Sequence, residues 1–325
     1  MQLTISPKIF FCAKLFMRMI SLLRLFCPLL FLFPFFLFAN PDLDVIHEYG
    51  PFIIHCSEQD ADFAAEAGKV LIKSYKEISY DFALDSAEHF QVYIMPTRKS
   101  FQRALRGELP NWTGAFAVPS QHLMVIKSPR WNSADDYNQV LIHELVHLVV
   151  HGIIGAHKLP RWIDEGMAIF YSGEDRWKTD LAVSKALTTN SILSLSEIDD
   201  VLEYHRAKAD LAYQQSFSAV NYLLATYDIE ALRGIIFSLK QGADIHQAFW
   251  NATGSDFADF EQEWRAYIEK SHRWLWIYEI NEYIWGGILF LAIAAFVSRY
   301  IRNKRIQRDW RDESLSAEDD EFADS

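Results

Sequence analysis

Residues 140–150 read VLIHELVHLVV and hold two histidines four positions apart, His143 and His147, with Glu144 between them. Residues four apart lie on one face of a helix, so both imidazoles can reach one metal ion. Glu144 lies about 100° around the helix from His143, where it can hold a water molecule on the ion rather than the ion itself. The uncharged flanks predict a buried helix, in which these three polar groups are costly without a partner. A metal ion supplies that partner.

A catalytic zinc ion needs a third protein ligand and an open fourth position. The best candidate ligand is Glu165, which lies 18 positions after His147 in the segment LPRWIDEGMA, residues 159–168. Pro160 predicts the start of a second helix, and the small Gly166 and Ala168 predict close packing against the first. The alternative is that Asp164 and Glu165 are a solvated pair at a helix start, where the helix dipole favours anions.

These two motifs carry a resemblance to a known family. The stretch 91–173 resembles the peptidase MA-like (gluzincin) family, in which a HExxH helix is followed by a W-x-[ND]-E-G-x-A helix whose glutamate is the third zinc ligand. Further along, Ala212–Ser216 resembles the family's Y-x-x-[SG] segment, and residues 242–265 resemble its ending. The resemblance implies an α+β, thermolysin-like metallopeptidase domain with a small sheet, an active-site helix and then a helical subdomain.

The resemblance also implies a mechanism. The Zn²⁺ ion would lower the pKa of its bound water and polarise a peptide carbonyl. Glu144 would take the proton of that water and pass it to the departing amine. Tyr213 of the Y-x-x-[SG] segment is the candidate oxyanion donor, although a tyrosine on an amphipathic helix is also a common core residue.

The groups that would orient the metal ligands are left open by the sequence. The acid that thermolysin-like enzymes carry four positions after the glutamate is absent, because Ile169 stands there. Asp164 and Glu174 are alternatives. His151 and His157 are expected at the surface or beside the ligands.

Two competing functions follow from the same residues. One is a non-catalytic, zinc-containing binding module tethered to a membrane, but a purely structural site needs no base such as Glu144. The other is an intramembrane protease, which the distance of the motif from both apolar runs and the neighbouring Arg161, Asp164 and Glu165 disfavour. The substrate is a peptide or protein, and endopeptidase and exopeptidase action both remain open.

The elements around the motifs alternate between strand and helix. Strands are predicted by period-two or short apolar runs at Phe52–His55, Phe90–Met95 and His122–Ile126, with residues 114–118 also able to run extended. Helices are predicted for Glu58–Tyr80, for a segment capped by Thr97, for Ser133–His151, for Pro160–Tyr171, and through much of Thr179–Lys270. We expect one metallopeptidase domain over residues 41–272.

The N-terminal residues predict export. Scattered cations precede Leu25–Ala39, which carries no charge and ends on a small residue, so residues 1–39 are typical of a signal peptide. Met17 or Met19 would give a signal of more usual length, and an uncleaved anchor is the alternative. Cys12 and Cys27 fall in this segment, which leaves Cys56 alone in the exported domain, without a disulfide partner.

The C-terminal residues predict a membrane anchor. The run Tyr283–Ser298 has no charged residue, and we expect a transmembrane helix over 280–300; a buried core helix is the alternative. Aromatic residues precede the run, and a basic cluster follows it: Arg299, Arg302, Lys304, Arg305 and Arg308. The positive-inside rule then places the tail, residues 301–325, in the cytoplasm and the domain outside it. The acidic end, Asp312–Ser325, is predicted to be disordered.

The formal net charge of −12 argues against a nucleic-acid partner, because binding to phosphates needs clustered Lys and Arg. No basic stripe occurs in the central region.

Overall fold

The computed structural model describes residues 43–85, 88–105, 114–131, 136–173, 176–203, 206–272 and 277–323. These residues form two compact units: one contains the residues up to Arg176 together with Leu193–Gln262, and the other contains Trp177–Ile192 and the residues from Glu263 onward. The predicted signal peptide, residues 1–39, lies outside the described residues, as do Ser133 and Glu174.

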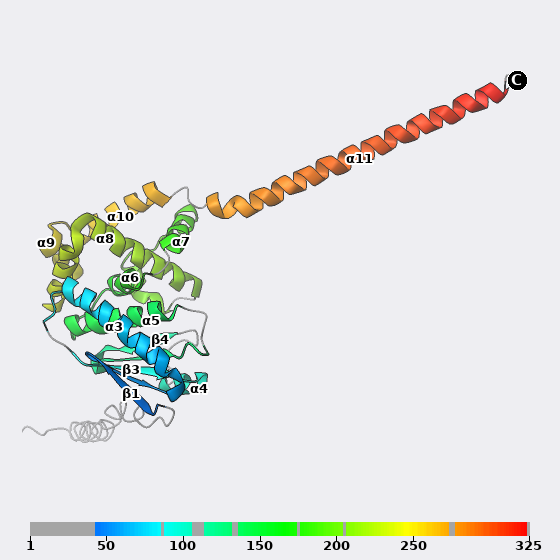
Figure 1. The fold of residues 1–325 in the computed structure, drawn as a ribbon. Coiled ribbons are helices and arrows are strands. Elements are labelled where there is room, and N and C mark those ends of the chain that lie inside the picture. Colours follow the sequence, from blue (N-terminus) through cyan, green and yellow to red (C-terminus); the bar gives the residue numbers. More distant parts are fainter. Residues whose placement is uncertain are drawn as a thin grey trace, which may run out of the picture. The chain divides into compact units, whose positions relative to one another are not determined.

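A five-stranded mixed sheet forms the base of the first unit (Figure 1). Its strands are β1 (Val45–Tyr49), β2 (Phe52–Cys56), β3 (Phe90–Met95), β4 (Ala115–Val118) and β5 (Leu123–Lys127), in the order β1-β2-β3-β5-β4. The central strands β2, β3 and β5 are parallel, and β1 and β4 are antiparallel edges. The three predicted strands and the extended segment are confirmed, whereas β1 was not predicted.

The helices are α3 (Ala61–Asp81), α4 (Arg98–Leu105), α5 (Tyr137–Ile154), α6 (Arg161–Ser172), α7 (Arg176–Thr188), α8 (Arg206–Lys240), α9 (Ile245–Thr253), α10 (Phe257–His272) and α11 (Ile277–Ala323). Helix α8 is broken at Asp228, where φ is 64°. Thr97 caps α4 as predicted, because its Oγ1 accepts a hydrogen bond from the backbone N–H of Ser100 at 3.1 Å. The mixed α+β class is confirmed, with helices predominating.

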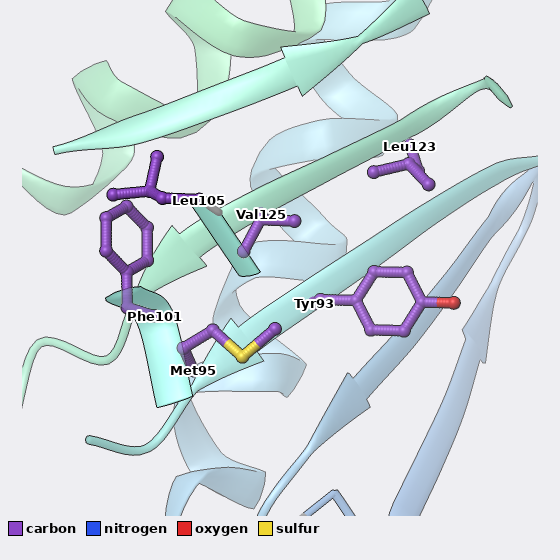
Figure 2. Packing of buried hydrophobic residues seen from close by; sticks show 6 residues of the cluster. All are labelled: Tyr93, Met95, Phe101, Leu105, Leu123 and Val125. Atoms are coloured by element: carbon purple, nitrogen blue, oxygen red, sulfur yellow. The ribbon is translucent and has the colours of Figure 1, made fainter. Parts of the chain in front are cut away.

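Alternation along the strands gives the sheet two apolar faces. On one face Phe52 of β2 meets Tyr75 of α3 edge to face, and α3 and α5 pack side by side over this face. On the other face β3 and β5 pack against α4 (Figure 2). The cluster on that second face consists of Tyr93, Met95, Phe101, Leu105, Leu123 and Val125. Because both faces are covered, the strands are almost continuously apolar, as parallel strands usually are.

A buried carboxylate ties the start of α3 to the segment that follows β5. Asp60 is fully buried; its Oδ1 accepts hydrogen bonds from Ser128 Oγ at 2.6 Å and Arg130 Nε at 2.7 Å, and its Oδ2 accepts one from Ser57 Oγ at 2.7 Å. Burial would raise the pKa of Asp60, but these hydrogen bonds and the charge of Arg130 hold it below its usual value. The Asp60 carboxylate is therefore ionised, and both of its oxygens accept hydrogen bonds.

Helix α11 belongs to the second unit and includes one segment, Ile284–Arg308, long and apolar enough to cross a membrane. This segment has a mean hydropathy of 1.8 and none of it is buried. The prediction of disorder after Asp312 is wrong as far as Ala323, because the helix continues to that residue. Extending an existing helix needs no new nucleation, and the Glu, Ala and Leu of this segment are good helix formers.

Candidate metal centre

Helix α5 carries the three HExxH residues, His143, Glu144 and His147. Asp136 caps the helix, since its side chain accepts hydrogen bonds from the backbone N–H groups of Asn138 and Gln139. The helix therefore begins at Tyr137 rather than at the predicted Ser133. It runs through Gly152, where an end was predicted, and stops at Gly155, whose φ of 68° suits a glycine.

Helix α6 supplies the acidic residues and lies between α5 and α8. It begins after Pro160 and ends at Gly173, as predicted. The expected contact of Gly166 with the first helix is wrong, however. A Cβ on Gly166 would lie 2.4 Å from the carbonyl oxygen of Ser216 and 2.5 Å from Val220 Cγ2, both on α8. This glycine therefore sets the approach of α6 to α8, not to α5.

The two helices bring His143, His147 and Glu165 together, so that one ligand atom of each lies within 4.8 Å of the others. Glu165 Oε2 lies 3.5 Å from His143 Nε2 and 3.6 Å from His147 Nε2. In a tetrahedral site with ligands at about 2.1 Å, neighbouring ligand atoms are about 3.4 Å apart. The two oxygen–nitrogen separations match this spacing, and two imidazole nitrogens with one carboxylate oxygen are ligands of the type that zinc binds.

Asp164 contacts His147 at Nδ1, the ring nitrogen opposite the one that faces Glu165. Its Oδ1 lies 2.7 Å from His147 Nδ1, and its Oδ2 lies 3.0 Å from Nε2 of His151. With the proton on Nδ1, His147 donates to Asp164 and leaves Nε2 free to bind an ion. Of the two acids considered from sequence, Asp164 makes this contact, and His151 lies beside it as expected. Ile169, in the position where an acid was sought, is buried in the core.

Asp164 and His147 each shift the pKa of the other. Burial would raise the pKa of Asp164, but the charge of His147 and the hydrogen bonds from His147 and His151 hold that pKa well below its usual range. Burial would lower the pKa of His147, and the carboxylates of Asp164 and Glu165 outweigh it and raise that pKa. Asp164 is thus an anion in the folded protein.

Glu144 is buried beside the two histidines. Burial raises the pKa of its carboxyl, while the charges of His147 and His143 oppose that rise. A carboxyl group with a raised pKa is a better proton acceptor than a free one, and this suits a group that takes up a proton during a reaction.

Tyr213 comes to the same region from α8 and is half buried. Burial raises the pKa of its phenol, and the charge of Glu165 is the next largest cause. Arg161 acts on the same phenol in the opposite direction. The phenol is therefore close enough to Glu165 and Arg161 to sense both charges.

Two neighbours of the cluster were not singled out as site residues from the sequence. Arg161 Nη1 lies 3.5 Å from both Asp164 Oδ2 and Glu165 Oε1. The i,i+3 and i,i+4 spacing on one helix could have revealed this. Asp199 accepts a hydrogen bond from the backbone N–H of Arg161 at 2.9 Å. No local pattern signals that contact, because it joins residues 38 positions apart.

The chain was compared with known proteins. A search of curated protein sequences gives no match. The family model of the Peptidase MA superfamily matches residues 72–270, which is more than half of the chain and includes α5, α6 and most of α10. This family is generally zinc-dependent, and its name indicates a peptidase. The resemblance seen in the sequence is confirmed, and the chain belongs to the Peptidase MA superfamily.

Proposed function

We propose that this chain is a zinc-dependent peptidase of the gluzincin type, anchored in a membrane by α11 with its catalytic domain on the extracytoplasmic side. The observation that carries the proposal is the convergence of His143 Nε2 and His147 Nε2 on Glu165 Oε2 in a member of a peptidase family. In this proposal His143, His147 and Glu165 hold the ion, in a thermolysin-like arrangement.

A zinc ion held there would lower the pKa of water and polarise the peptide carbonyl. Glu144 accepts a proton from the attacking water and returns it to the departing amine, a role that its burial and raised pKa support. Tyr213 donates its phenolic O–H to the oxyanion; its raised pKa keeps that proton in place at neutral pH. Asp164 holds the Nδ1 proton of His147 and so orients that ligand.

The zinc assignment is tested by elemental analysis of the detergent-solubilised full-length protein. We expect one zinc per chain in the wild type, and its loss in His147→Ala and in Glu165→Ala. The matched control is His246→Ala, because His246 is an exposed histidine paired with Asp256 at 2.9 Å. Stoichiometric zinc in either ligand variant would refute the site.

The peptidase assignment is tested by digestion of a peptide library, with and without a chelator. We expect cleavage that the chelator abolishes and added zinc restores. A wild-type protein that binds zinc but cleaves no peptide would instead indicate a binding module.

The anchor is supported by the exposed apolar segment Ile284–Arg308 and by the exposed cations near its C-terminal end. A span with this charge distribution puts its basic end in the cytoplasm. A reporter that works only in the cytoplasm should therefore be active when it is fused after Ser325, and the protein should resist extraction by alkaline carbonate. An inactive fusion of this reporter, together with an active fusion of a reporter that works only outside the cytoplasm, would overturn the orientation.

A further inference from the structure

The two carboxylate oxygens of Glu165 have different partners. Oε2 faces the Nε2 atoms of His143 and His147, at 3.5 and 3.6 Å. Oε1 faces Nη1 of Arg161, at 3.5 Å. One oxygen of Glu165, Oε2, therefore faces the proposed metal position, and the other, Oε1, faces the guanidinium of Arg161.

The same guanidinium contacts Asp164. Nη1 of Arg161 lies 3.5 Å from Asp164 Oδ2, while Asp164 Oδ1 lies 2.7 Å from His147 Nδ1. One cation thus touches both the candidate third ligand and the carboxylate that orients the second histidine. The side chains of Asp164 and Glu165 are only 3% and 7% exposed, so these charge interactions are weakly screened by solvent.

The backbone of Arg161 is held in place by a hydrogen bond to Asp199. Its backbone N–H donates to Asp199 Oδ1 at 2.9 Å, at the first turn of α6. This bond satisfies one of the N–H groups that a helix start leaves unpaired. The helix turn then places Asp164 and Glu165 three and four residues further on, on the face that Arg161 covers.

We propose that Arg161 is a positioning residue for the metal centre: it holds Glu165 Oε1 away from the ion, so that Glu165 binds through Oε2 alone. This inference rests on the proposed zinc site. A carboxylate is able to bind a cation through one oxygen or both. Binding through both would occupy the position that a catalytic zinc site keeps open for water or substrate.

The test uses the full-length protein in detergent and the variants Arg161→Gln and Arg161→Lys. Gln has nearly the same reach but no charge, and Lys keeps the charge without the planar guanidinium. The matched control is Lys158→Gln, because Lys158 is a cation just before α6 that is 79% exposed and pairs with Asp199 rather than with Asp164 or Glu165.

Two measurements report on the metal rather than on activity. The first is the rate at which zinc is lost to an excess of chelator; the second is the visible spectrum after substitution with Co²⁺, whose absorption weakens as the coordination number rises. For Arg161→Gln we expect a weaker Co²⁺ absorption and zinc loss that is slower by about tenfold, because a second carboxylate oxygen then binds the ion and a nearby positive charge is gone. Arg161→Lys should lie between this variant and the wild type, and Lys158→Gln should match the wild type.

The outcomes separate this inference from the proposed function. If Arg161→Gln and Arg161→Lys both match the wild type in Co²⁺ spectrum and zinc loss, Arg161 does not position Glu165, although the zinc site stands. If the wild type itself binds neither ion, the proposed function fails first. Should Arg161→Gln not fold, Arg161→Lys decides: a Co²⁺ spectrum and a rate of zinc loss equal to those of Lys158→Gln would refute the positioning role.

Discussion

Gly166 is the position where a single methyl group should have the clearest effect on stability. In isolation, Gly→Ala in a helix stabilises it by about 1 kcal/mol. At Gly166, however, the new Cβ would lie 2.4 Å from the carbonyl oxygen of Ser216 and 2.5 Å from Val220 Cγ2. The first neighbour is backbone and cannot rotate away, so α6 must move from α8 at a cost near the upper end of the 1–3 kcal/mol typical of overpacking, about 3 kcal/mol. The net effect is a loss of about 2 kcal/mol.

The matched control is Gly152→Ala in α5. A Cβ there meets only Glu88 Oε2 at 3.2 Å, the end of a flexible and partly exposed side chain. This variant should keep most of the 1 kcal/mol of helix propensity, about 0.5–1 kcal/mol.

Thermal unfolding followed by tryptophan fluorescence measures both variants. For a unit of about 200 residues we expect Tm to fall by about 4–8 °C in Gly166→Ala and to rise by about 1–4 °C in Gly152→Ala. If Gly166→Ala were as stable as Gly152→Ala, the close approach of α6 to α8 would be wrong.

Three further predictions concern the proposed base and the core. Glu144→Gln should keep its zinc and lose about 10²- to 10⁴-fold in kcat, measured with a cleaved peptide; unchanged kcat would exclude it as the base. Phe101→Ala should cost about 3–5 kcal/mol of stability in urea unfolding but leave zinc content unchanged, because its cluster lies on the sheet face away from α5; zinc loss would contradict this. Asp60→Asn should lose about 1–3 kcal/mol at pH 7. Because the folded-state pKa of Asp60 is lowered, wild-type stabilisation is present above an unfolded pKa of about 3.9 and is lost as pH falls through the folded pKa. The difference between wild type and Asp60→Asn should therefore shrink in acid, and a constant difference would refute the role of its charge.

The HExxH segment was readable because its information is local. Spacing alone puts His143 and His147 on one face of a helix, and the neighbouring motif nominated Glu165. The structure brings these three side chains together. The helix limits were less accurate: Asp136 caps α5 where Ser133 was expected, since several residues in a row were able to serve as the cap.

What the sequence could not provide were contacts set by packing. Gly166 was correctly read as a close-contact residue, but its partner is α8, far along the chain. Strand β1 was not predicted because Ile46 and Glu48 of this edge strand face solvent, which leaves only a weak apolar pattern. The contact of Asp164 with His147 depends on how the turn between α5 and α6 aligns the two helices, and no spacing rule fixes that.

The buried thiol of Cys56 on β2 can be used to measure how often the structure around the sheet opens. Cys56 is fully buried, and burial, with the charges of Asp60 and Asp44, raises its pKa to about 11. Alkylating reagents need an accessible thiolate, so the folded sheet withholds both the access and the ionised form. Cys56 lies on the same face of β2 as Phe52, the face that α3 covers, so exposure of its thiol requires α3 to move away from the sheet. The rate of alkylation of the peptide that carries Cys56, followed by mass spectrometry, therefore reports how often α3 and the sheet separate, and the measurement needs no label added to the chain.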